Sequence, residues 1–297
     1  MSCPDCFTGS VHSHAGEAKG KEDTLHGKKC YIASPPSTSS TSTSVIIYLT
    51  DVFGLNLINA KHLADRFAVE TGCKVLMPDV IPGHGGPVSL LDAIGVISEP
   101  VALWDVGGQL RRIAAVFAVG WYSIPLSIRL STRATPKRAY PDIAQFARAV
   151  REELPPGAKL GVVGFCWGGY ASTNLCKEPA VVGGSERLID VQFCGHPYGL
   201  KTPDMIVDAV RTHKVPFSMA IGDKDKFFKR ERVEETEAAL RQKAGSGEGV
   251  DGYNYEIKVY RGCTHGFVVR AKPNNEVETA AAEQARAQAV GWLKKYL

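Results

Sequence analysis

Short apolar runs alternate along the chain with longer segments in which apolar residues recur every three or four positions. The runs have the length of strands, and their lack of polar positions is typical of strands buried on both faces of a parallel sheet. They cover residues 45–49, 73–77, 160–164, 189–193 and 215–221. Residues 255–260 alternate between polar and apolar, which predicts a strand nearer an edge, and residues 26–33 are expected to form a further short strand.

The segments between these runs carry a helical pattern. The expected helices follow the turn at residue 54 and cover residues 141–153, residues from about 170 onward, 229–243 and 277–296. Strands that alternate with helices predict an α/β protein whose mostly parallel sheet is covered by helices on both faces. Reactive groups in such a sheet gather in the loops at the carboxyl ends of its strands.

Residues 1–25 are polar and are expected to form an extended arm, and residues 26–297 are expected to form one α/β domain. The least regular part of that domain contains sixteen consecutive residues without a charge, 113–128, flanked by arginines. A membrane-spanning helix needs about 20 apolar residues, and Pro125 is expected to interrupt a helix here. We therefore expect a buried helix or a lid, and no membrane span.

Composition narrows the class of protein. The 297 residues are 44% apolar and 22% charged, and the net charge of +4 comes with no run of Lys or Arg, so we expect no nucleic-acid partner. The N-terminus lacks a basic segment followed by an apolar run, so we expect a cytoplasmic protein whose eight cysteines are reduced. Cys3 and Cys6 with His12 and His14 resemble a metal site. The two histidines are only one residue apart, so we expect no metal and no other cofactor.

The chemistry centres on Gly164-Phe-Cys-Trp-Gly168, which matches the nucleophile elbow of α/β-hydrolases with Cys166 in the place of serine. A sharp turn from strand to helix holds the nucleophile in strained backbone angles, and the two glycines let neighbouring chains pass without a Cβ clash. The helix that follows directs its positive end at the thiol, which favours the thiolate. The alternative is a buried structural thiol, which has no need of this glycine spacing.

A thiol nucleophile needs a base within hydrogen-bond reach and an acid that orients the base. In this fold the order along the chain is nucleophile, acid, histidine. His265, in the loop after strand 255–260, is the expected base, and His196 is the alternative, which is otherwise expected to line the pocket. For the acid we favour Asp225 over Asp223, which is closer to the strand end and better placed to cap the turn. The expected oxyanion donors are the backbone N–H groups of Trp167 and Val52.

These motifs resemble those of the dienelactone hydrolase family, whose elbow reads Gly-x-Cys-x-Gly-Gly. The likeness covers residues 26–297 and includes residues 51–56, Pro78-Asp79, residues 222–225 and His265-Gly-Phe267. Residues 2–7 are similar to the fungal branch of the family. The resemblance implies an α/β-hydrolase fold and a Cys-His-Asp triad that cleaves an ester or lactone. Residues 97–140 match the family poorly and are expected to form a divergent lid.

The resemblance also bears on control of the nucleophile and on substrate binding. Bacterial relatives place a Glu after the first buried strand, where it contacts the nucleophile, and Asp51 matches that position with one methylene fewer. Those relatives bind a substrate carboxylate with two arginines. The loop after Pro78-Asp79 has no Arg here, and Arg270 lies one residue later than expected. We therefore expect a substrate other than dienelactone.

The expected function is hydrolysis of a small carboxylic ester or lactone through an acyl-thiol intermediate, by a monomer or homodimer. A catalytically silent binding protein with this fold is one alternative. Acyl transfer or lyase-type chemistry on a polyketide-like substrate is another, because the same thiol could act while water is excluded.

Overall fold

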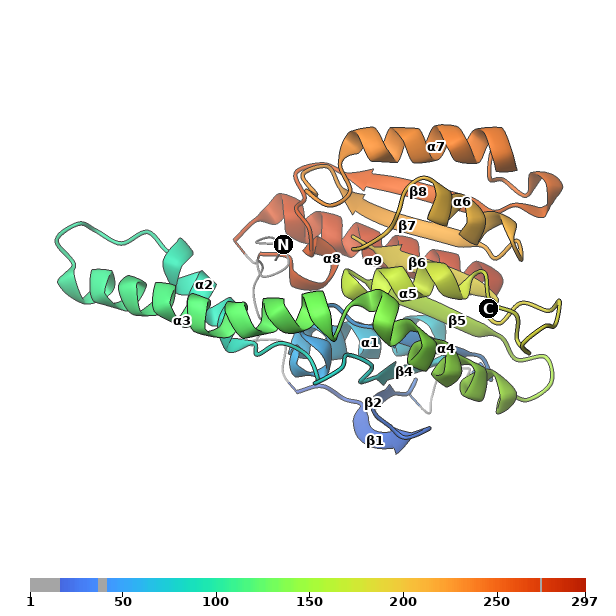
Figure 1. Cartoon of the computed structure of the whole chain (residues 1–297), viewed down its shortest axis with the longest axis horizontal. Helices are drawn as coiled ribbons and strands as arrows, with labels where there is room; N and C mark the ends of the chain where they lie inside the picture. Colours follow the sequence, from blue (N-terminus) through green and yellow to red (C-terminus); the bar gives the residue numbers. More distant parts are fainter. Residues whose placement is uncertain (1–16, 37–41, 273) are drawn as a thin grey trace.

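An eight-stranded sheet runs through the molecule in the order β1-β2-β4-β3-β5-β6-β7-β8 (Figure 1). The computed structural model describes residues 17–36, 42–272 and 274–297. The strands are β1 (Lys21–Leu25), β2 (Lys28–Ala33), β3 (Val45–Leu49), β4 (Lys74–Pro78), β5 (Leu160–Phe165), β6 (Val191–Gly195), β7 (Phe217–Gly222) and β8 (Tyr255–Tyr260). The six strands from β3 to β8 pair in parallel, whereas β1 and β2 pair antiparallel, so the expected mostly parallel α/β-hydrolase sheet is confirmed.

Burial explains the strand pattern. Every residue of β5, β6 and β7 is buried, as expected of apolar runs with helices on both faces. The alternating strand β8 lies at the edge of the sheet, as predicted, and is only partly buried. Lys21–Leu25, which we had counted with the polar arm, instead forms the other edge as β1, where polar side chains can face water.

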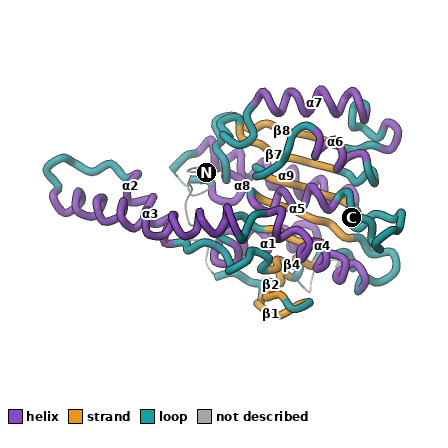
Figure 2. Tube along the Cα trace, in the orientation of Figure 1, coloured by secondary structure: helices purple, strands orange, loops and turns teal. Residues whose placement is uncertain are grey.

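Helices cover both faces of the sheet (Figure 2). They are α1 (Ile58–Thr71), α2 (Ser89–Ser98), α3 (Val106–Thr132), α4 (Pro136–Glu152), α5 (Trp167–Leu175), α6 (Asp204–Arg211), α7 (Arg230–Ala244), α8 (Phe267–Arg270) and α9 (Glu276–Tyr296). Helix α1 packs beside α9, and α4, α5 and α6 follow one another across the opposite face. Because these helices cover the faces of the sheet, the loops at the carboxyl ends of the strands are the expected place for a functional site.

Two helices begin elsewhere than the sequence predicted. Helix α4 begins at Pro136, with Thr135 as its cap, so Pro141 lies inside the helix rather than at its start. Pro136 takes the first helical position, where its missing N–H costs no hydrogen bond, whereas Pro141 lies one turn further in and leaves the carbonyl of Lys137 without its helical donor. Helix α5 begins at Trp167, directly after Cys166, rather than near residue 170.

Helix α3 is the largest departure from expectation. It is 27 residues long, and with α2 it forms a hairpin that projects from the body of the molecule (Figure 1). The expectation that Pro125 interrupts a helix here is wrong, because α3 continues to Thr132. Pro125 is exposed, so water can satisfy the carbonyl that loses its partner. The expectation of a buried helix is also wrong. In the most apolar stretch of α3, 18 residues long, only 11% of the residues are buried.

Candidate active site

The strand order places the candidate site at the centre of the sheet. After β3 the chain moves to β4 on one side, and it then crosses over β3 to β5 on the other side. Such a reversal opens a crevice between the carboxyl ends of the two strands. Asp51 and Val52 follow β3, and Cys166 follows β5, so this crevice brings the two loops together. The N–H of Gly168 donates to the carbonyl of Thr50 over 3.0 Å and ties them to each other.

Cys166 occupies a strained elbow between β5 and α5. Its φ of 49° and ψ of −110° are unfavourable for a residue with a side chain. The elbow depends on close backbone approach at two glycines. A Cβ on Gly164 would lie 2.6 Å from the carbonyl oxygen of Gly168, and a Cβ on Gly168 would lie 2.3 Å from that of Leu49. The N–H of Tyr198 donates to the carbonyl of Cys166 over 2.9 Å and braces the turn from β6.

His265 and Asp225 form a buried pair beside this elbow. The two loops that carry them follow β8 and β7, which are neighbours in the sheet. The Nδ1 atom of His265 lies 2.8 Å from Oδ2 of Asp225, and both side chains are fully buried. The other carboxylate oxygen of Asp225 accepts the N–H groups of Phe227 and Phe228. Asp223 is exposed and accepts the N–H of Cys263, so Asp225 is the acid next to the histidine.

The charges around His265 favour its protonated form. Burial alone would lower its pKa, but the negative charges of Cys166 and Asp225, with the hydrogen bond to Asp225, raise the pKa of His265 to about 10. A protonated imidazole near a thiol favours the ionised form of that thiol.

A second buried ion pair lies near the elbow. The guanidinium of Arg270 donates to the carboxylate of Asp51, and both side chains are fully buried. Desolvation raises the pKa of Asp51 against the lowering effect of Arg270, and the charge of Cys166 raises it further. The N–H of Phe53 donates to the same carboxylate over 3.0 Å. The centroid of the Phe53 ring lies 5.2 Å from the guanidinium carbon of Arg270. Asp51 is therefore close enough to the thiol for each charge to affect the other.

Two backbone amides are available between the two loops. Within the described ranges, the N–H groups of Val52 and Trp167 donate to no protein acceptor. Trp167 follows Cys166 directly, at the first position of α5, where the helix dipole is positive. The carbonyl of Val52 accepts the N–H of Gly86 over 2.8 Å, which fixes the peptide next to its free amide.

His196 lies among aromatic rings next to the buried pair. Its ring centroid is 5.0 Å from that of His265 and 6.1 Å from that of Phe267. Neither ring nitrogen has a hydrogen-bond partner in the part of the chain that the structure describes. Burial lowers the pKa of His196 well below its usual value, and the positive charges of His265 and Arg270 lower it further. His196 is therefore a neutral ring that packs against the histidine of the pair.

Sequence reasoning did not find three side chains near His265. Phe227 lies 4.9 Å from the His265 ring between centroids, and Tyr198 lies 5.0 Å from Phe227. Glu278, from α9, is buried and accepts the hydroxyl of Thr264 and the N–H of Lys272, which holds the loop of His265 from both ends. Tyr198 and Phe227 lie just beyond the carboxyl ends of β6 and β7, a position that could have singled them out. Glu278 has no such signal.

The remaining cysteines and a possible metal site were the other candidates from the sequence. Cys30, Cys73, Cys176, Cys194 and Cys263 are buried and form no disulfide. Burial raises the pKa of Cys30 and of Cys194 to about 12, so these thiols stay protonated. No group of His, Cys, Asp or Glu within the described residues could hold a metal ion. Cys3, Cys6, His12 and His14 lie outside those residues.

Comparison with known proteins matches this architecture. The model of the dienelactone hydrolase family matches residues 29–297, which is nearly the whole chain. The chain belongs to the dienelactone hydrolase family. As a member of this family it is an enzyme, a hydrolase of carboxylic esters or lactones. The similarity to fungal proteins extends from the N-terminus, where the sequence suggested it, along nearly the whole chain.

Relatives of this member of the family match it from end to end. "Hydrolase pyvD" of Aspergillus violaceofuscus is 28% identical over 98% of this chain and 96% of its own. "Carboxymethylenebutenolidase homolog" of Mus musculus is 24% identical over 99% of this chain and 97% of its own. Among solved structures, a putative dienelactone hydrolase from Klebsiella pneumoniae is 17% identical with a TM-score of 0.62, covering 93% of this chain and 98% of its own, which shows the shared fold.

Proposed function

We propose that this enzyme hydrolyses a small carboxylic ester or lactone with Cys166 as nucleophile, His265 as base and Asp225 as the residue that orients the base. The observation that carries the proposal is the position of His265. Its Nδ1 atom is held 2.8 Å from the Asp225 carboxylate, its Nε2 atom is buried without a hydrogen-bond partner among the described residues, and the charge of Cys166 raises its pKa. Such an order of thiol, imidazole and carboxylate is what nucleophilic catalysis requires.

In the resting enzyme the Cys166 thiol has given its proton to His265, and in the first step the thiolate attacks the carbonyl carbon. The N–H groups of Val52 and Trp167 stabilise the negative charge that forms on the carbonyl oxygen. When the tetrahedral intermediate collapses, the imidazolium of His265 gives its proton to the leaving alcohol oxygen. The product of this step is an acyl-thiol on Cys166. In a lactone the leaving oxygen stays attached to the acyl chain.

In the second step water takes the place of the alcohol. His265 removes a proton from the water, which attacks the acyl-thiol carbonyl, and the same two N–H groups stabilise the oxyanion. Collapse breaks the C–S bond and releases the carboxylic acid, and the thiolate returns beside the imidazolium. No cofactor is needed in either step.

Asp51, Arg270 and His196 support this chemistry in the proposal. Asp51 is close enough to Cys166 to favour the thiol over the thiolate, and Arg270 limits that effect by neutralising the carboxylate. Because Arg270 is buried and already paired with Asp51, it is unsuited to bind a substrate carboxylate as well. His196 keeps the ring of His265 in place and lines the pocket.

For the substrate class we propose an unsaturated lactone or an ester with an apolar acyl group. Rings of Tyr198, Phe227 and Phe267 gather around His265 and His196, and such a setting favours a planar or apolar substrate. The names of several relatives refer to carboxymethylenebutenolidase, which agrees with a lactone. We propose that the enzyme acts in the cytoplasm, which the buried cysteines without a disulfide support. We also propose that it is a monomer or a homodimer.

The test is to assay the full chain with an aryl acetate and an unsaturated lactone, beside Cys166→Ala and Cys176→Ala. We expect Cys176→Ala to retain activity, because that thiol is buried away from the proposed chemistry, and Cys166→Ala to fall by orders of magnitude while keeping its circular dichroism spectrum. Equal rates for wild type and Cys166→Ala would remove Cys166 as nucleophile.

Two further measurements separate the alternatives. Brief alkylation with iodoacetamide at neutral pH, followed by mass mapping, should modify Cys166 and leave the five other described cysteines intact. An added alcohol or thiol competes with water for the acyl-thiol. If the free acid remains the main product, the enzyme is a hydrolase in practice, whereas a predominant new ester or thioester would identify an acyltransferase.

A further inference from the structure

An unusual apolar surface lies on the α2–α3 hairpin, far along the chain from the triad residues. Fifteen large apolar residues are exposed in the described part of the molecule, and ten of them fall between residues 103 and 128. These ten are Leu103, Trp104, Val106, Leu110, Ile113, Val116, Phe117, Trp121, Ile124 and Ile128. Their exposed fractions are high, for example 75% for Phe117 and 78% for Trp121. A patch of this kind marks an interaction surface in a soluble protein.

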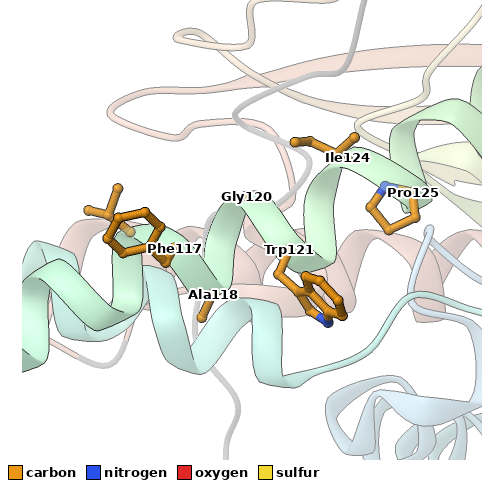
Figure 3. A pocket seen from close by; sticks show the side chains of 7 residues that line it. Phe117, Ala118, Gly120, Trp121, Ile124 and Pro125 are labelled. Carbon is orange, nitrogen blue, oxygen red and sulfur yellow. The ribbon is translucent and has the colours of Figure 1, made fainter.

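The exposed residues of α3 form a continuous stripe. Seven of them follow one another at intervals of three or four residues: Val106, Leu110, Ile113, Phe117, Trp121, Ile124 and Ile128. At about 100° per residue these positions fall within an arc of about 80° on one side of the helix. Phe117, Trp121, Ile124 and Pro125 line a shallow apolar depression along α3 (Figure 3).

The opposite side of α3 already has a partner. Ala115 and Leu126 are buried there, against α2 and the body of the molecule. The helix is therefore apolar on both sides, and one of these sides faces solvent. A helix that is apolar all round is normally buried in a core or in lipid, and α3 is exposed along most of its length.

The charges on α3 itself are all positive, whereas the exposed acidic residues of the hairpin, Asp92, Glu99 and Asp105, lie on α2 and in the loop that precedes α3. From residue 106 to residue 141 the sequence contains no Asp or Glu. The same segment contains six basic residues: Arg111, Arg112, Arg129, Arg133, Lys137 and Arg138. Arg111 and Arg133 are exposed, whereas Arg129 bonds to the carbonyls of Gly83 and His84 at the base of the hairpin.

We propose that the α2–α3 hairpin binds an anionic lipid surface, with α3 lying in the plane of the membrane interface and its apolar stripe turned toward the acyl chains. Positive charge beside an exposed apolar stripe is the combination that such a surface attracts. Trp104 and Trp121 are residues that favour the depth of the headgroups. By length and composition the 27-residue helix α3 could cross a bilayer. We propose the interface instead, because its sixteen uncharged residues, 113–128, extend about 24 Å against a hydrocarbon core of about 30 Å, and because α2 already covers one side of the helix.

Charge also argues against a second copy of this chain as the occupant. Two α3 helices packed along their stripes would bring the arginines of both copies together. The nearest exposed acids, Glu99 and Asp105, lie before α3 rather than among these arginines, and Asp105 already caps the helix. Anionic headgroups supply the missing negative charge, whereas a self-association would have to tolerate the repulsion.

The test is sedimentation of the full chain with vesicles of phosphatidylcholine alone and of phosphatidylcholine with phosphatidylserine. We expect binding to the anionic vesicles that weakens as salt is raised. Phe117→Ser with Trp121→Ser should weaken it by about tenfold or more. Arg111→Gln with Arg133→Gln should also weaken it by about tenfold or more, and only for the anionic vesicles. Neither pair belongs to the proposed catalytic residues, so esterase activity in solution should be retained.

Matched controls use exposed residues elsewhere on the molecule. The first control, Val181→Ser with Val182→Ser, removes two exposed apolar side chains. The second, Arg241→Gln with Lys243→Gln, removes two exposed charges. Both should leave vesicle binding unchanged. Failure of the wild type to bind anionic vesicles would overturn the proposal. If the Phe117/Trp121 variant then converted a dimer to a monomer in analytical ultracentrifugation, a second copy would be the occupant. If it changed only KM in solution, the helix would be a lid.

Discussion

His265 donates a hydrogen bond from Nδ1 to Oδ2 of Asp225 over 2.8 Å, with both side chains fully buried and 40 residues apart in the sequence. The bond fixes the tautomer of the imidazole and leaves Nε2, which has no hydrogen-bond partner among the described residues, available for the proton exchange with Cys166 that we propose. The charge of Asp225 is also one of the reasons that the pKa of His265 is raised to about 10. Orientation and protonation of the proposed base therefore both depend on one carboxylate.

Replacing Asp225 with Asn should lower kcat/KM by about 10³- to 10⁴-fold, because the amide keeps the shape but loses the charge and the preferred tautomer. It should also change the pH profile. The raised pKa means that the imidazolium, which protonates the leaving group, persists in the wild type until the pH rises through about 10. Without the carboxylate that pKa falls, so the alkaline decline of kcat/KM should move to lower pH.

Asp223→Asn is the matched control. This carboxylate is exposed and bonds only to the N–H of Cys263 among the described residues, so its loss should change kcat/KM little and leave the alkaline limb in place. Equal effects of the two substitutions would show that His265 is not oriented by Asp225.

The elbow glycines should be essential for stability as well as for activity. In Gly168→Ala the new Cβ would lie 2.3 Å from the carbonyl oxygen of Leu49, a backbone atom that cannot move aside. We expect a loss of about 1–3 kcal/mol or more in the free energy of unfolding, measured with urea. Gly95→Ala, also within a helix, meets nothing within 4 Å and should instead stabilise the protein by about 0.5–1 kcal/mol. A similar change in both variants would refute the close-packed elbow.

The buried pair of Asp51 and Arg270 should respond differently to the loss of each partner. Asp51→Asn leaves a buried guanidinium that cannot lose its proton, and we expect a cost of about 3–5 kcal/mol in the free energy of unfolding at all pH values. Arg270→Met leaves a carboxyl group that can take up a proton. Desolvation already raises the pKa of Asp51, and without Arg270 the pKa rises further.

The pH dependence separates the two variants. In Arg270→Met the folded state binds the Asp51 proton more tightly than the unfolded state, so its stability should fall as pH rises from about 4 toward the raised pKa. Urea unfolding at pH 5 and pH 8 should therefore show a larger deficit at pH 8 for Arg270→Met, and a nearly constant deficit for Asp51→Asn. A constant deficit for both would mean that Asp51 keeps its charge without Arg270.

The parts of the fold that follow from local pattern were predictable. Fully apolar runs identified the buried strands, and the glycine spacing around Cys166 identified the elbow, because both depend on residues adjacent in the sequence. Helix α3 was not predictable in the same way. Its apolar residues suggested burial, but they lie on two opposite sides of the helix, and only one side has a partner in the part of the chain that the structure describes.

The candidate site was predictable only where its residues follow strand ends in a fixed order. Asp225 and His265 follow β7 and β8 directly, so the fold brings them together. Glu278 supports the His265 loop from a helix, and Phe227 reaches His265 by a ring contact. Such contacts depend on how helices and loops pack over the sheet, which no short sequence pattern records.

His196 tests whether the second histidine near the site acts as a base or as a packing ring. His196→Phe preserves a planar ring where neither nitrogen has a partner among the described residues, so we expect kcat/KM within about tenfold of wild type. His265→Phe should lose roughly 10⁴-fold. Stability gives an independent reading. Because burial lowers the pKa of His196, the unfolded state takes up a proton below pH 6.5 that the folded state refuses.

The wild type should therefore lose up to about 1.4 kcal/mol of stability for each pH unit below 6.5 through this one group. His196→Phe has no such proton to gain. The backbone φ at position 196 is 38°, a conformation that histidine tolerates better than phenylalanine, so the variant should start less stable at pH 7.5. The gap between the two proteins should narrow steadily as pH falls to 5. A parallel decline would mean that His196 is charged in the folded enzyme, and an inactive His196→Phe would make it the catalytic base.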